Sequence, residues 1–388
     1  MTRIIVAGAL ANKPFNGGEA WVRLGWVLGL AKLGFEVDWV EQIREETCVN
    51  AQHHASPVED SIQWQYFDKI ARSFNLSATL VSETRPLAWG RYSFEELKGV
   101  FSRAALLINI SGNISREDLL NQTRRKAYVD VDPGYTQIWH TRGQLGGLLE
   151  KHDVHFSVGQ NIGSQACDLP TGAIRWRPIL PPVVLDHWPL SDFAPRRQFS
   201  TVGRWRGPFG SVEWQGRTLG MKCHEFRKFA ELPGKSAHSF ELAYDFHSTD
   251  EKDRTLLASS GWALANVHQA AADPFDYRDY LQSSAAEFSV ANGVYVHAKT
   301  GWFSDRSALY LASGRPVLVQ DTGLPSVLKG ESTGVLTFDD LDSAIDGADR
   351  IMKNYSSFQS AARRFAENHL DSNRVLSRFL EQAELASS

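Results

Sequence analysis

The segment from Arg3 to Val40 constrains the fold most, because it reads as a strand, a helix and a second strand in close succession. Arg3 to Gly8 is an apolar run rich in β-branched residues, and it leads into a loop ending in Gly17-Gly18. From Glu19 to Leu33 apolar residues recur at helical spacing, Gly34 ends the helix, and Phe35 to Val40 predicts the second strand. Such a βαβ unit builds a parallel sheet with helices on its faces. The sequence therefore predicts an α/β fold.

The strand and helix rhythm continues, breaks once and then restarts. Proline-rich sequence between Pro178 and Pro195 is stiff and extended, and the strand pattern resumes at Phe199. We therefore expect two Rossmann-like, doubly wound domains facing a cleft, residues 1–190 and 191–365, dividing near residues 178–198. The other expected strands are Ala104 to Ile110, Lys126 to Val131, Val154 to Val158, Phe240 to Tyr244, Ala285 to Val290 and Pro316 to Gln320.

Composition excludes several classes of protein. A formal charge of -4 and a pI near 6.3 give no global attraction to phosphate backbones, so nucleic acid is not an expected partner. Three widely spaced cysteines fit neither a disulfide framework nor a zinc site, and the twelve histidines show no paired metal spacing. No apolar run approaches membrane-spanning length and no signal peptide is evident. We expect a cytoplasmic protein without an integral membrane segment, and a homodimer remains open.

Two basic segments are candidates for binding an anion. Doubly wound domains bind ligands at the carboxyl ends of their strands. Arg204 lies in the glycine-flanked loop after the Phe199 strand, and Lys222 begins the next helix, so together they would neutralise a diphosphate. The alternative is an exposed basic loop.

The second candidate is the loop Lys299 to Ser307, which opens a short helix. Its backbone N–H groups and positive helix end suit a phosphate, with Arg306 binding it and Ser304 or Ser307 donating hydrogen bonds. Packing alone would also explain this pattern.

The run from Ala308 to Val317, with Ser313-Gly314-Arg315-Pro316 before an apolar strand, resembles the donor-site helix of GT-B glycosyltransferases with a C-terminal domain of the bacterial glycogen-synthase type. Arg204 and Lys222 resemble that superfamily's diphosphate-binding pair, and Gly17-Gly18 matches its glycine-rich first loop. The resemblance implies sugar transfer from a nucleotide sugar to an acceptor, with no metal and no cofactor. It also implies that a C-terminal helix, residues 366–388, packs back toward the first domain.

One position departs from this pattern. Many retaining members carry a glutamate five residues before the glycine of the donor helix, where this chain has Leu309. The ribose contact would then come from Asp305 or Glu287. Glu287, at a strand end, would otherwise accept sugar hydroxyls or cap a helix. Trp262 would stack on the nucleobase or belong to the core.

The first domain is expected to supply the acceptor side. Asp130 and Asp132 lie two residues apart after a strand, where they would act as a general base or bind acceptor hydroxyls, form a metal pair, or serve as turn formers. His155 lies on the next strand and is a further catalytic candidate. The neighbouring loops supply the remaining acceptor-side candidates, which are Gly17, Gly18, Ser111, Gly112 and Asn161.

Three functions fit these residues. The first is a hexosyl- or pentosyltransferase that uses a nucleoside-diphosphate sugar. The second is a nucleotide-sugar epimerase of the same fold, and the third is an inactive nucleotide-sugar-binding protein. A nicotinamide-dependent dehydrogenase is disfavoured because no GxGxxG follows the first strand.

Overall fold

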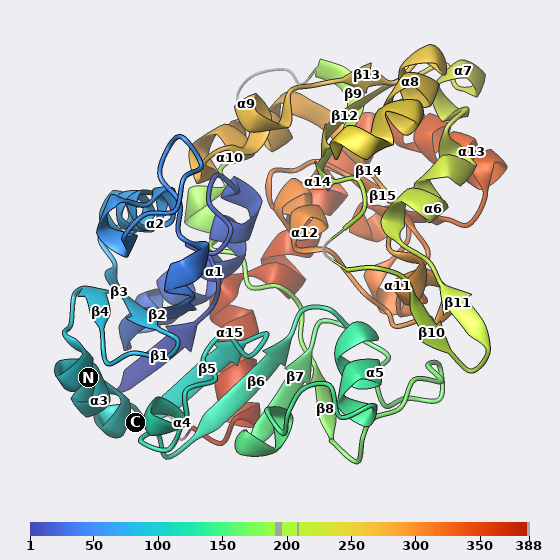
Figure 1. Ribbon diagram of the computed structural model, residues 1–388. Helices are drawn as coiled ribbons and strands as arrows, with labels where there is room; N and C mark the ends of the chain where they lie inside the picture. The colour runs from blue at the N-terminus through green and yellow to red at the C-terminus, as the bar shows by residue number, and fades with distance from the viewer. Residues whose placement is uncertain (191–195, 208, 386–388) are drawn as a thin grey trace.

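A computed structural model of the protein describes residues 1–190, 196–207 and 209–385. Its architecture consists of two parallel sheets, each flanked by helices (Figure 1). The α/β class and the pair of Rossmann-like units are thus confirmed. The first sheet has the order β4-β3-β2-β1-β5-β6-β7-β8, and all its neighbours are parallel except β3 and β4. Its strands are β1 Arg3–Ala7, β2 Glu36–Ile43, β3 Ser77–Ser82, β4 Ala88–Gly90, β5 Leu106–Ile110, β6 Lys126–Asp130, β7 Val154–Ser157 and β8 Trp176–Pro178.

The second sheet has the order β13-β12-β9-β14-β15-β16 and is entirely parallel. Its strands are β9 Arg196–Arg204, β12 Ser239–Asp245, β13 Ala263–Leu264, β14 Ser284–Ser289, β15 Val317–Gln320 and β16 Val335–Phe338. A separate antiparallel hairpin, β10 Val212–Trp214 with β11 Arg217–Leu219, lies between β9 and the helix that Lys222 begins.

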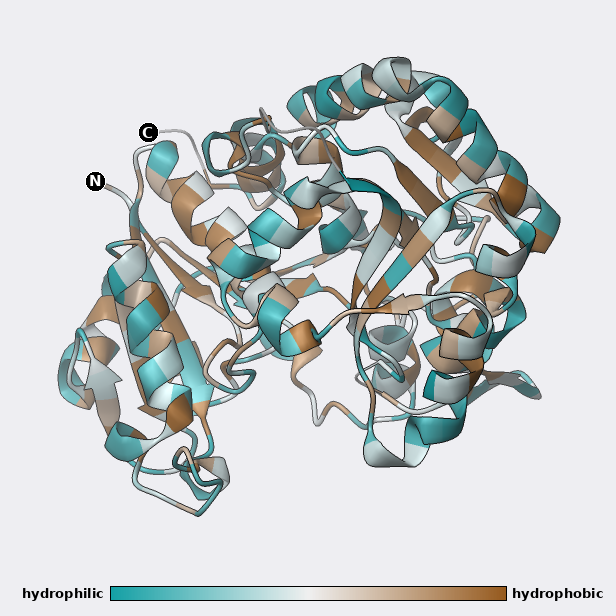
Figure 2. Cartoon of the chain, turned by 90° about the horizontal axis from the view of Figure 1, so that it is seen from above, coloured by the Kyte–Doolittle hydropathy of each residue, from teal (hydrophilic) through white to brown (hydrophobic). Residues whose placement is uncertain are grey.

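Helices cover both faces of each sheet. Successive side chains of a strand therefore pack against helices on opposite faces. In β1, Ile4 and Val6 belong to one core with helices α1, α2 and α15, whereas Ile5 and Ala7 belong to another with α3. Viewed from above, the strands are predominantly brown and the outer helices carry more teal (Figure 2). The helices are α1 Gly17–Lys32, α2 Ile62–Ser73, α3 Phe94–Arg103, α4 Glu117–Leu120, α5 Tyr135–Thr141, α6 Lys222–Phe226, α7 Leu232–Lys235, α8 Glu251–Ser259, α9 Val267–Ala271, α10 Pro274–Ser283, α11 Gly293–His297, α12 Asp305–Ala312, α13 Leu341–Lys353, α14 Tyr355–Phe365 and α15 Ser372–Gln382.

The last helix lies with the first domain, as the red α15 beside the blue α1 shows in Figure 1. Trp26 of α1 packs edge-on against Phe379 of α15, with ring centroids 5.0 Å apart. Just before α15, Val183 exchanges backbone hydrogen bonds with Leu370 and Ser372, of 2.8 and 2.9 Å. The chain therefore returns to the first domain after completing the second.

The connection between the sheets runs from Pro178, the last residue of β8, to Arg196, the first of β9. Pro195, where the sequence pattern placed the end of the junction, lies outside the described residues. The interval contains isolated structure, including a 3₁₀ turn at Leu185–His187. Below, the first domain means the first sheet with its helices and α15, and the second domain means the second sheet with helices α6 to α14.

Candidate functional site

In the second sheet, successive strands are added first on one side of β9 and then on the other. From β9 the chain passes to β12 on one side and later to β14 on the other, so the carboxyl ends of β9 and β14 mark the topological switch point. Ligands of doubly wound sheets bind in the crevice that such a switch point creates. Here the strands end near Gly203 and Ser289. The side chains around these two residues are therefore the first to consider.

Lys222 reaches this switch point from the first position of α6. A Cβ at Gly203 would lie 3.8 Å from Lys222 Nζ and 3.5 Å from an Arg306 nitrogen, so glycine leaves the space that both cations share. Among the described residues no carboxylate lies within ion-pair distance of Lys222, whose ammonium instead lies 5.7 Å from the Tyr244 ring centre. Burial, and then the charge of Arg306, lowers the pKa of Lys222 from 10.5 to about 7, although Glu287 acts in the opposite direction.

Arg306 differs from Lys222 because protein oxygens already bind it. It is 9% exposed, and each of its three nitrogens donates a hydrogen bond: to Glu287 Oε1 at 2.6 Å, to the Val202 carbonyl at 2.8 Å and to Ser289 Oγ at 2.7 Å. Glu287 is fully buried. The pair therefore ties α12 to β14 and β9. Arg306 is thus mainly a structural cation beside the site, which corrects its expected role in binding phosphate. Glu287 uses Oε1 for this pair, but its Oε2 is buried without a hydrogen-bond partner among the described residues, so the predicted contact with a sugar or ribose hydroxyl stays a prediction.

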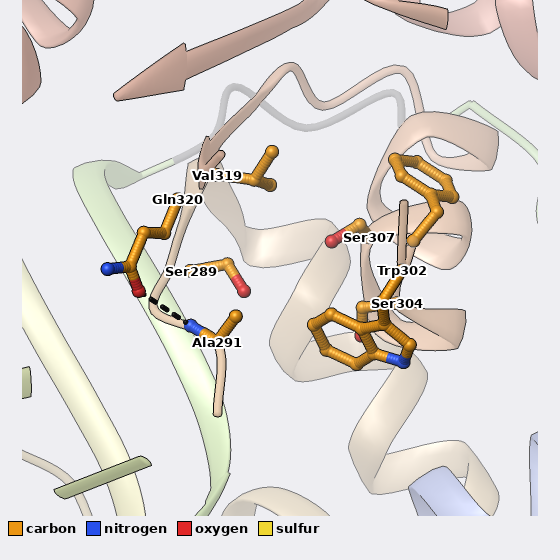
Figure 3. Close-up of a pocket in the computed structure, with 8 residues that line it drawn as sticks. Ser289, Ala291, Trp302, Ser304, Ser307, Val319 and Gln320 are labelled. Atoms are coloured by element: carbon orange, nitrogen blue, oxygen red, sulfur yellow. Dashed lines mark hydrogen bonds between the residues drawn. The ribbon is translucent and has the colours of Figure 1, made fainter. Parts of the chain in front are cut away.

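A small hollow opens next to this ion pair, between the ends of β14 and β15 and the start of α12 (Figure 3). Its cavity volume is about 10 Å³, which is room for about one water molecule. Ser304 is the N-cap of α12, and its Oγ accepts a hydrogen bond from the Arg306 N–H at 3.2 Å. Ser307 Oγ is buried without a partner among the described residues. The lining residues are Ser289, Ala291, Trp302, Phe303, Ser304, Ser307, Val319 and Gln320.

Two predicted donor residues are placed differently from what their patterns suggested. Trp262 is 4% exposed, packs among Phe226, Phe240 and Phe288, and donates its ring N–H to the Ala230 carbonyl at 2.8 Å. Its ring is therefore core and has no free face for a nucleobase. Arg204 ends β9 with an exposed side chain, and within the described chain it forms no ion pair. The structure thus brings Lys222 next to Arg306, whereas the predicted pairing of Lys222 with Arg204 at a diphosphate stays a prediction.

Asp130 holds the acceptor-side loop together. Its buried carboxylate accepts hydrogen bonds from Thr136 Oγ1 at 2.7 Å, Gln137 Nε2 at 2.9 Å, Ser157 Oγ at 2.8 Å and the Asp132 N–H at 3.0 Å. Burial raises the pKa of Asp130, and these donors oppose the shift. With four donors around it, Asp130 fixes the start of α5 and has a structural role rather than the expected catalytic one.

Asp132 is the carboxylate that this arrangement presents to the second domain. It is half-buried, and Tyr295 of α11 donates its hydroxyl to Asp132 Oδ1 at 3.2 Å. Burial, and then the negative charge of Asp130, raises the pKa of Asp132 from 3.8 to about 7, while Lys13 and the Tyr295 hydrogen bond act in the opposite direction. A carboxylate with a pKa near neutrality can accept a proton and release it at working pH.

His155 does not join Asp132, which corrects the catalytic assignment. It is the second residue of β7 and so lies toward the amino end of the strand, away from the ligand edge. Its Nε2 lies 2.8 Å from the Leu149 carbonyl, and burial lowers its pKa. Ser111 is exposed, and a Cβ at Gly112 would collide with Leu148.

The remaining acceptor-side candidates join the two domains. A Cβ at Gly17 would collide with the Asp273 carbonyl before α10, and one at Gly18 would lie 2.9 Å from the Tyr277 ring. These glycines therefore allow α1 to approach α10 closely. Asn161 donates its side-chain amide to the carbonyls of Lys299 at 2.8 Å and Gly323 at 2.7 Å. All three are domain contacts rather than open ligand positions.

Charged residues near the start of α1 form a second group that the sequence did not reveal. Glu19 pairs with Lys13 at 2.7 Å and also with Arg23, and although burial alone would raise the pKa of Glu19, these two cations lower it to about 2. Across the domain boundary, burial raises the pKa of Asp305 to about 6, while Arg23 and Lys13 oppose the shift and Glu19 contributes to it. The charges that act on Asp305 therefore come from α1 and the loop before it. The predicted contact of Asp305 with a donor ribose stays a prediction.

No metal cluster and no membrane span is found in the part of the chain that the structure describes. Within residues 1–190, 196–207 and 209–385, no three His, Cys, Asp or Glu side chains gather in a way that could hold a metal ion. No described helix is both long and apolar enough to cross a bilayer.

Comparison with known proteins agrees with the fold. No protein-family model and no curated protein matches the chain. Among solved structures, an alpha-glucosyltransferase in complex with UDP and a 13-mer DNA has a TM-score of 0.59 at 13% identity, covering 99% of this chain and 100% of its own. Sucrose-phosphate synthase from Thermosynechococcus elongatus has a TM-score of 0.57 at 12% identity and covers all of both chains. A UDP-N-acetylglucosamine 2-epimerase from Listeria monocytogenes, described as putative, has a TM-score of 0.50 at 11% identity, covering 99% of this chain and 97% of its own. At these identities the likeness establishes the GT-B fold.

Proposed function

We propose that the protein is a glycosyltransferase that moves a hexosyl or pentosyl group from a nucleoside-diphosphate sugar to an acceptor nucleophile. The observation that carries this proposal is Lys222, a half-buried ammonium at the switch point without a carboxylate partner in the described chain. Burial disfavours its charge, so an anion bound there would relieve a cost that the fold otherwise bears. The GT-B neighbours include proteins solved with UDP or UDP-glucose, and a diphosphate is an anion of the required kind.

The proposed donor site extends from Lys222 to the hollow at α12. The ammonium would bind the diphosphate, and Ser307 Oγ, which has no partner among the described residues, would donate to a phosphate or sugar oxygen. The N-terminus of α12 adds partial positive charge at the same place. Together these groups would stabilise the negative charge that develops on the departing diphosphate.

Asp132 would act on the acceptor side. The acceptor oxygen attacks the anomeric carbon, the bond between that carbon and the diphosphate oxygen breaks, and its electron pair leaves with the diphosphate. The acceptor proton passes to the Asp132 carboxylate. A pKa of about 7 suits this role because half of the carboxylate is already ionised at neutral pH.

One observation keeps epimerisation as a second candidate. An epimerase needs several carboxylates around the sugar, and Glu19 acts electrostatically on both Asp132 and Asp305 near the domain boundary. The Lys222 site serves either reaction, since both begin from a nucleotide sugar. The two reactions therefore differ in their products and not in donor binding.

A two-stage experiment tests the proposal. A thermal-shift screen of ADP, GDP, CDP, UDP and dTDP should reveal one base that raises Tm by several degrees at saturating ligand. The matching nucleotide sugars are then incubated with the protein and small-molecule fractions of a cell extract as acceptors. Transfer releases free nucleoside diphosphate, and epimerisation changes the sugar without releasing it. Binding without either product would contradict an enzymatic role, and the absence of any nucleotide binding would contradict the donor site.

A further inference from the structure

Asp132 receives its only side-chain hydrogen bond in the described chain from the opposite domain. Tyr295 lies on α11 of the second domain, and its hydroxyl donates to Asp132 Oδ1 at 3.2 Å. Asp130, by comparison, takes all its side-chain donors from the first domain. The two neighbouring carboxylates are therefore held by different parts of the molecule.

The Tyr295 ring is fixed by aromatic neighbours on two sides. It is 2% exposed. Trp302 stacks on it, with ring centroids 4.7 Å apart and an angle of 28° between the planes. Tyr135, from α5 of the first domain, meets it edge-on at 6.1 Å and 89°. A side chain packed in this way has little freedom to turn, so its hydroxyl is directed at Asp132.

Trp302 also connects Tyr295 to the proposed donor site, since it lines the hollow with Ser289 and Ser304. Its backbone forms a bridge with Gly159 of the first domain. The donor hollow, Trp302, Tyr295 and Asp132 thus form a continuous path of contacting residues across the domain boundary.

We propose that Tyr295 is a positioning residue for Asp132: from the donor domain, its hydroxyl orients the acceptor-side carboxylate and favours the ionised form. This inference rests on the proposed function for the role of Asp132 in transfer, but the contact itself does not. A hydroxyl that donates to a carboxylate stabilises its ionised form, so removing the donor should make Asp132 a weaker acid.

Several other charges face Asp132 and must stay constant in a test. Asp130 lies beside it on the strand end, Lys13 and Glu19 act on it from the first loop and α1, and the phenol rings of Tyr128 and Tyr135 lie within its electrostatic reach. Burial raises the pKa of Tyr295 far above the neutral range, so its hydroxyl stays protonated while Asp132 titrates. Tyr295→Phe keeps the ring and removes only the donor.

The test is a carboxyl ¹³C NMR titration of full-length protein labelled at aspartate, with the Asp132 signal assigned by its loss in Asp132→Asn. We expect Tyr295→Phe to raise the Asp132 pKa by about 0.5 to 1 unit, corresponding to loss of one hydrogen bond to a partly exposed carboxylate. Tyr135→Phe is the matched control: its hydroxyl points to the Gly210 carbonyl, 3.4 Å away, so the Asp132 pKa should stay within about 0.2 unit.

Equal pKa values in wild type and Tyr295→Phe, with both proteins folded by Tm, would overturn the proposal. An equal shift in both tyrosine variants would also overturn it, because that would indicate a general packing effect. The titration needs neither donor nor acceptor, so its outcome is independent of whether the protein proves to be a transferase. If UDP-glucose is turned over, Tyr295→Phe should also move the acidic limb of the kcat/KM profile upward by the same amount.

Discussion

Replacing Lys222 with methionine gives the sharpest test of the donor site. The lowered pKa of Lys222 has consequences for proton uptake on binding, for affinity and for stability. Its pKa of about 7 means that only half of the ammonium is charged at pH 7 and about a tenth at pH 8. A bound diphosphate would return the pKa toward its ordinary value. Nucleoside diphosphate binding should therefore take up about 0.5 proton at pH 7 and about 0.9 at pH 8.

The same titration sets the expected affinities. At pH 6.5, where Lys222 is mostly charged, Lys222→Met should weaken binding by roughly 10- to 150-fold, the effect of losing one charge-assisted hydrogen bond. Above pH 7 the wild-type affinity should fall by up to about tenfold per pH unit, because the protein must first bind a proton, whereas the variant should show no such slope. The difference between the two proteins therefore narrows as pH rises.

Stability should change in the opposite sense to binding. The folded protein depresses the Lys222 pKa below that of the unfolded chain, so the unfolded state binds more protons between about pH 7 and 10.5. The stability cost is largest at and below pH 7 and disappears as pH rises toward 10.5. Lys222→Met removes this cost, so without nucleotide it should raise the free energy of unfolding at pH 7 by on the order of 1–3 kcal/mol.

The assay is isothermal titration calorimetry in buffers of different ionisation enthalpy at pH 6.5 and 8, combined with urea unfolding. Lys235→Met is the control, since Lys235 is an exposed helical lysine whose ammonium pairs with Glu231. Proton uptake below about 0.2 at pH 8, or a Lys222→Met affinity within about twofold of wild type, would refute the reasoning.

Three further outcomes follow from other contacts. Arg306→Ala should destabilise the protein by about 3–5 kcal/mol in urea unfolding, because Glu287 is left buried and unpaired, and Glu287→Gln in the same chain should restore part of the loss. Asp132→Asn should lower kcat by at least about 100-fold while leaving nucleoside diphosphate Kd unchanged, and it should remove the acidic limb of the pH profile near 7. Turnover should persist in excess EDTA, which a loss restored by Mg²⁺ or Mn²⁺ would contradict.

The fold could be predicted because single segments show both the spacing of apolar residues and the glycine and proline residues that end helices and strands. The apolar runs of the first half coincide with strands β1, β2, β5, β6 and β7. The second sheet begins where the strand pattern restarts. The sequence pattern did not predict strands β3 and β8, because β3 is rich in polar residues and β8 has only three residues. Ser77–Ser82, for example, begins and ends in serine although five of its six residues are buried.

The site was harder to predict, since spacing identifies strand ends but not the partners that a side chain finds there. The chemistry of Arg306 and Trp262 suits a ligand, but in the structure Arg306 pairs with Glu287 and Trp262 belongs to the core. The loop positions of Gly17, Gly18 and Asn161 suggested a role in acceptor binding. In the structure these residues contact the second domain, which no local sequence pattern encodes. Alternation along β14 and β15 would have found Ser289 and Gln320, the last residue of each strand, but nothing local connects Tyr295 to Asp132.

Three other buried charges show why Lys222 and Asp132 stand out. Glu41 accepts three backbone N–H groups and the Asn12 amide, Asp130 accepts four donors, and Arg306 donates to three oxygens. Each of these groups is compensated within the fold, as buried charges usually are.

Lys222 and Asp132 are the contrast, and they belong to opposite domains. Lys222 has no acidic partner within the described ranges, and Asp132 is held by a single side-chain donor and faces the negative charge of Asp130. Each is therefore held near the midpoint of its titration at neutral pH, at a cost in stability. Proteins retain such costs mainly where function requires them. A substrate that brings an anion to Lys222 and a hydroxyl proton to Asp132 would relieve both at once, which is the requirement of a transfer reaction carried out between two domains.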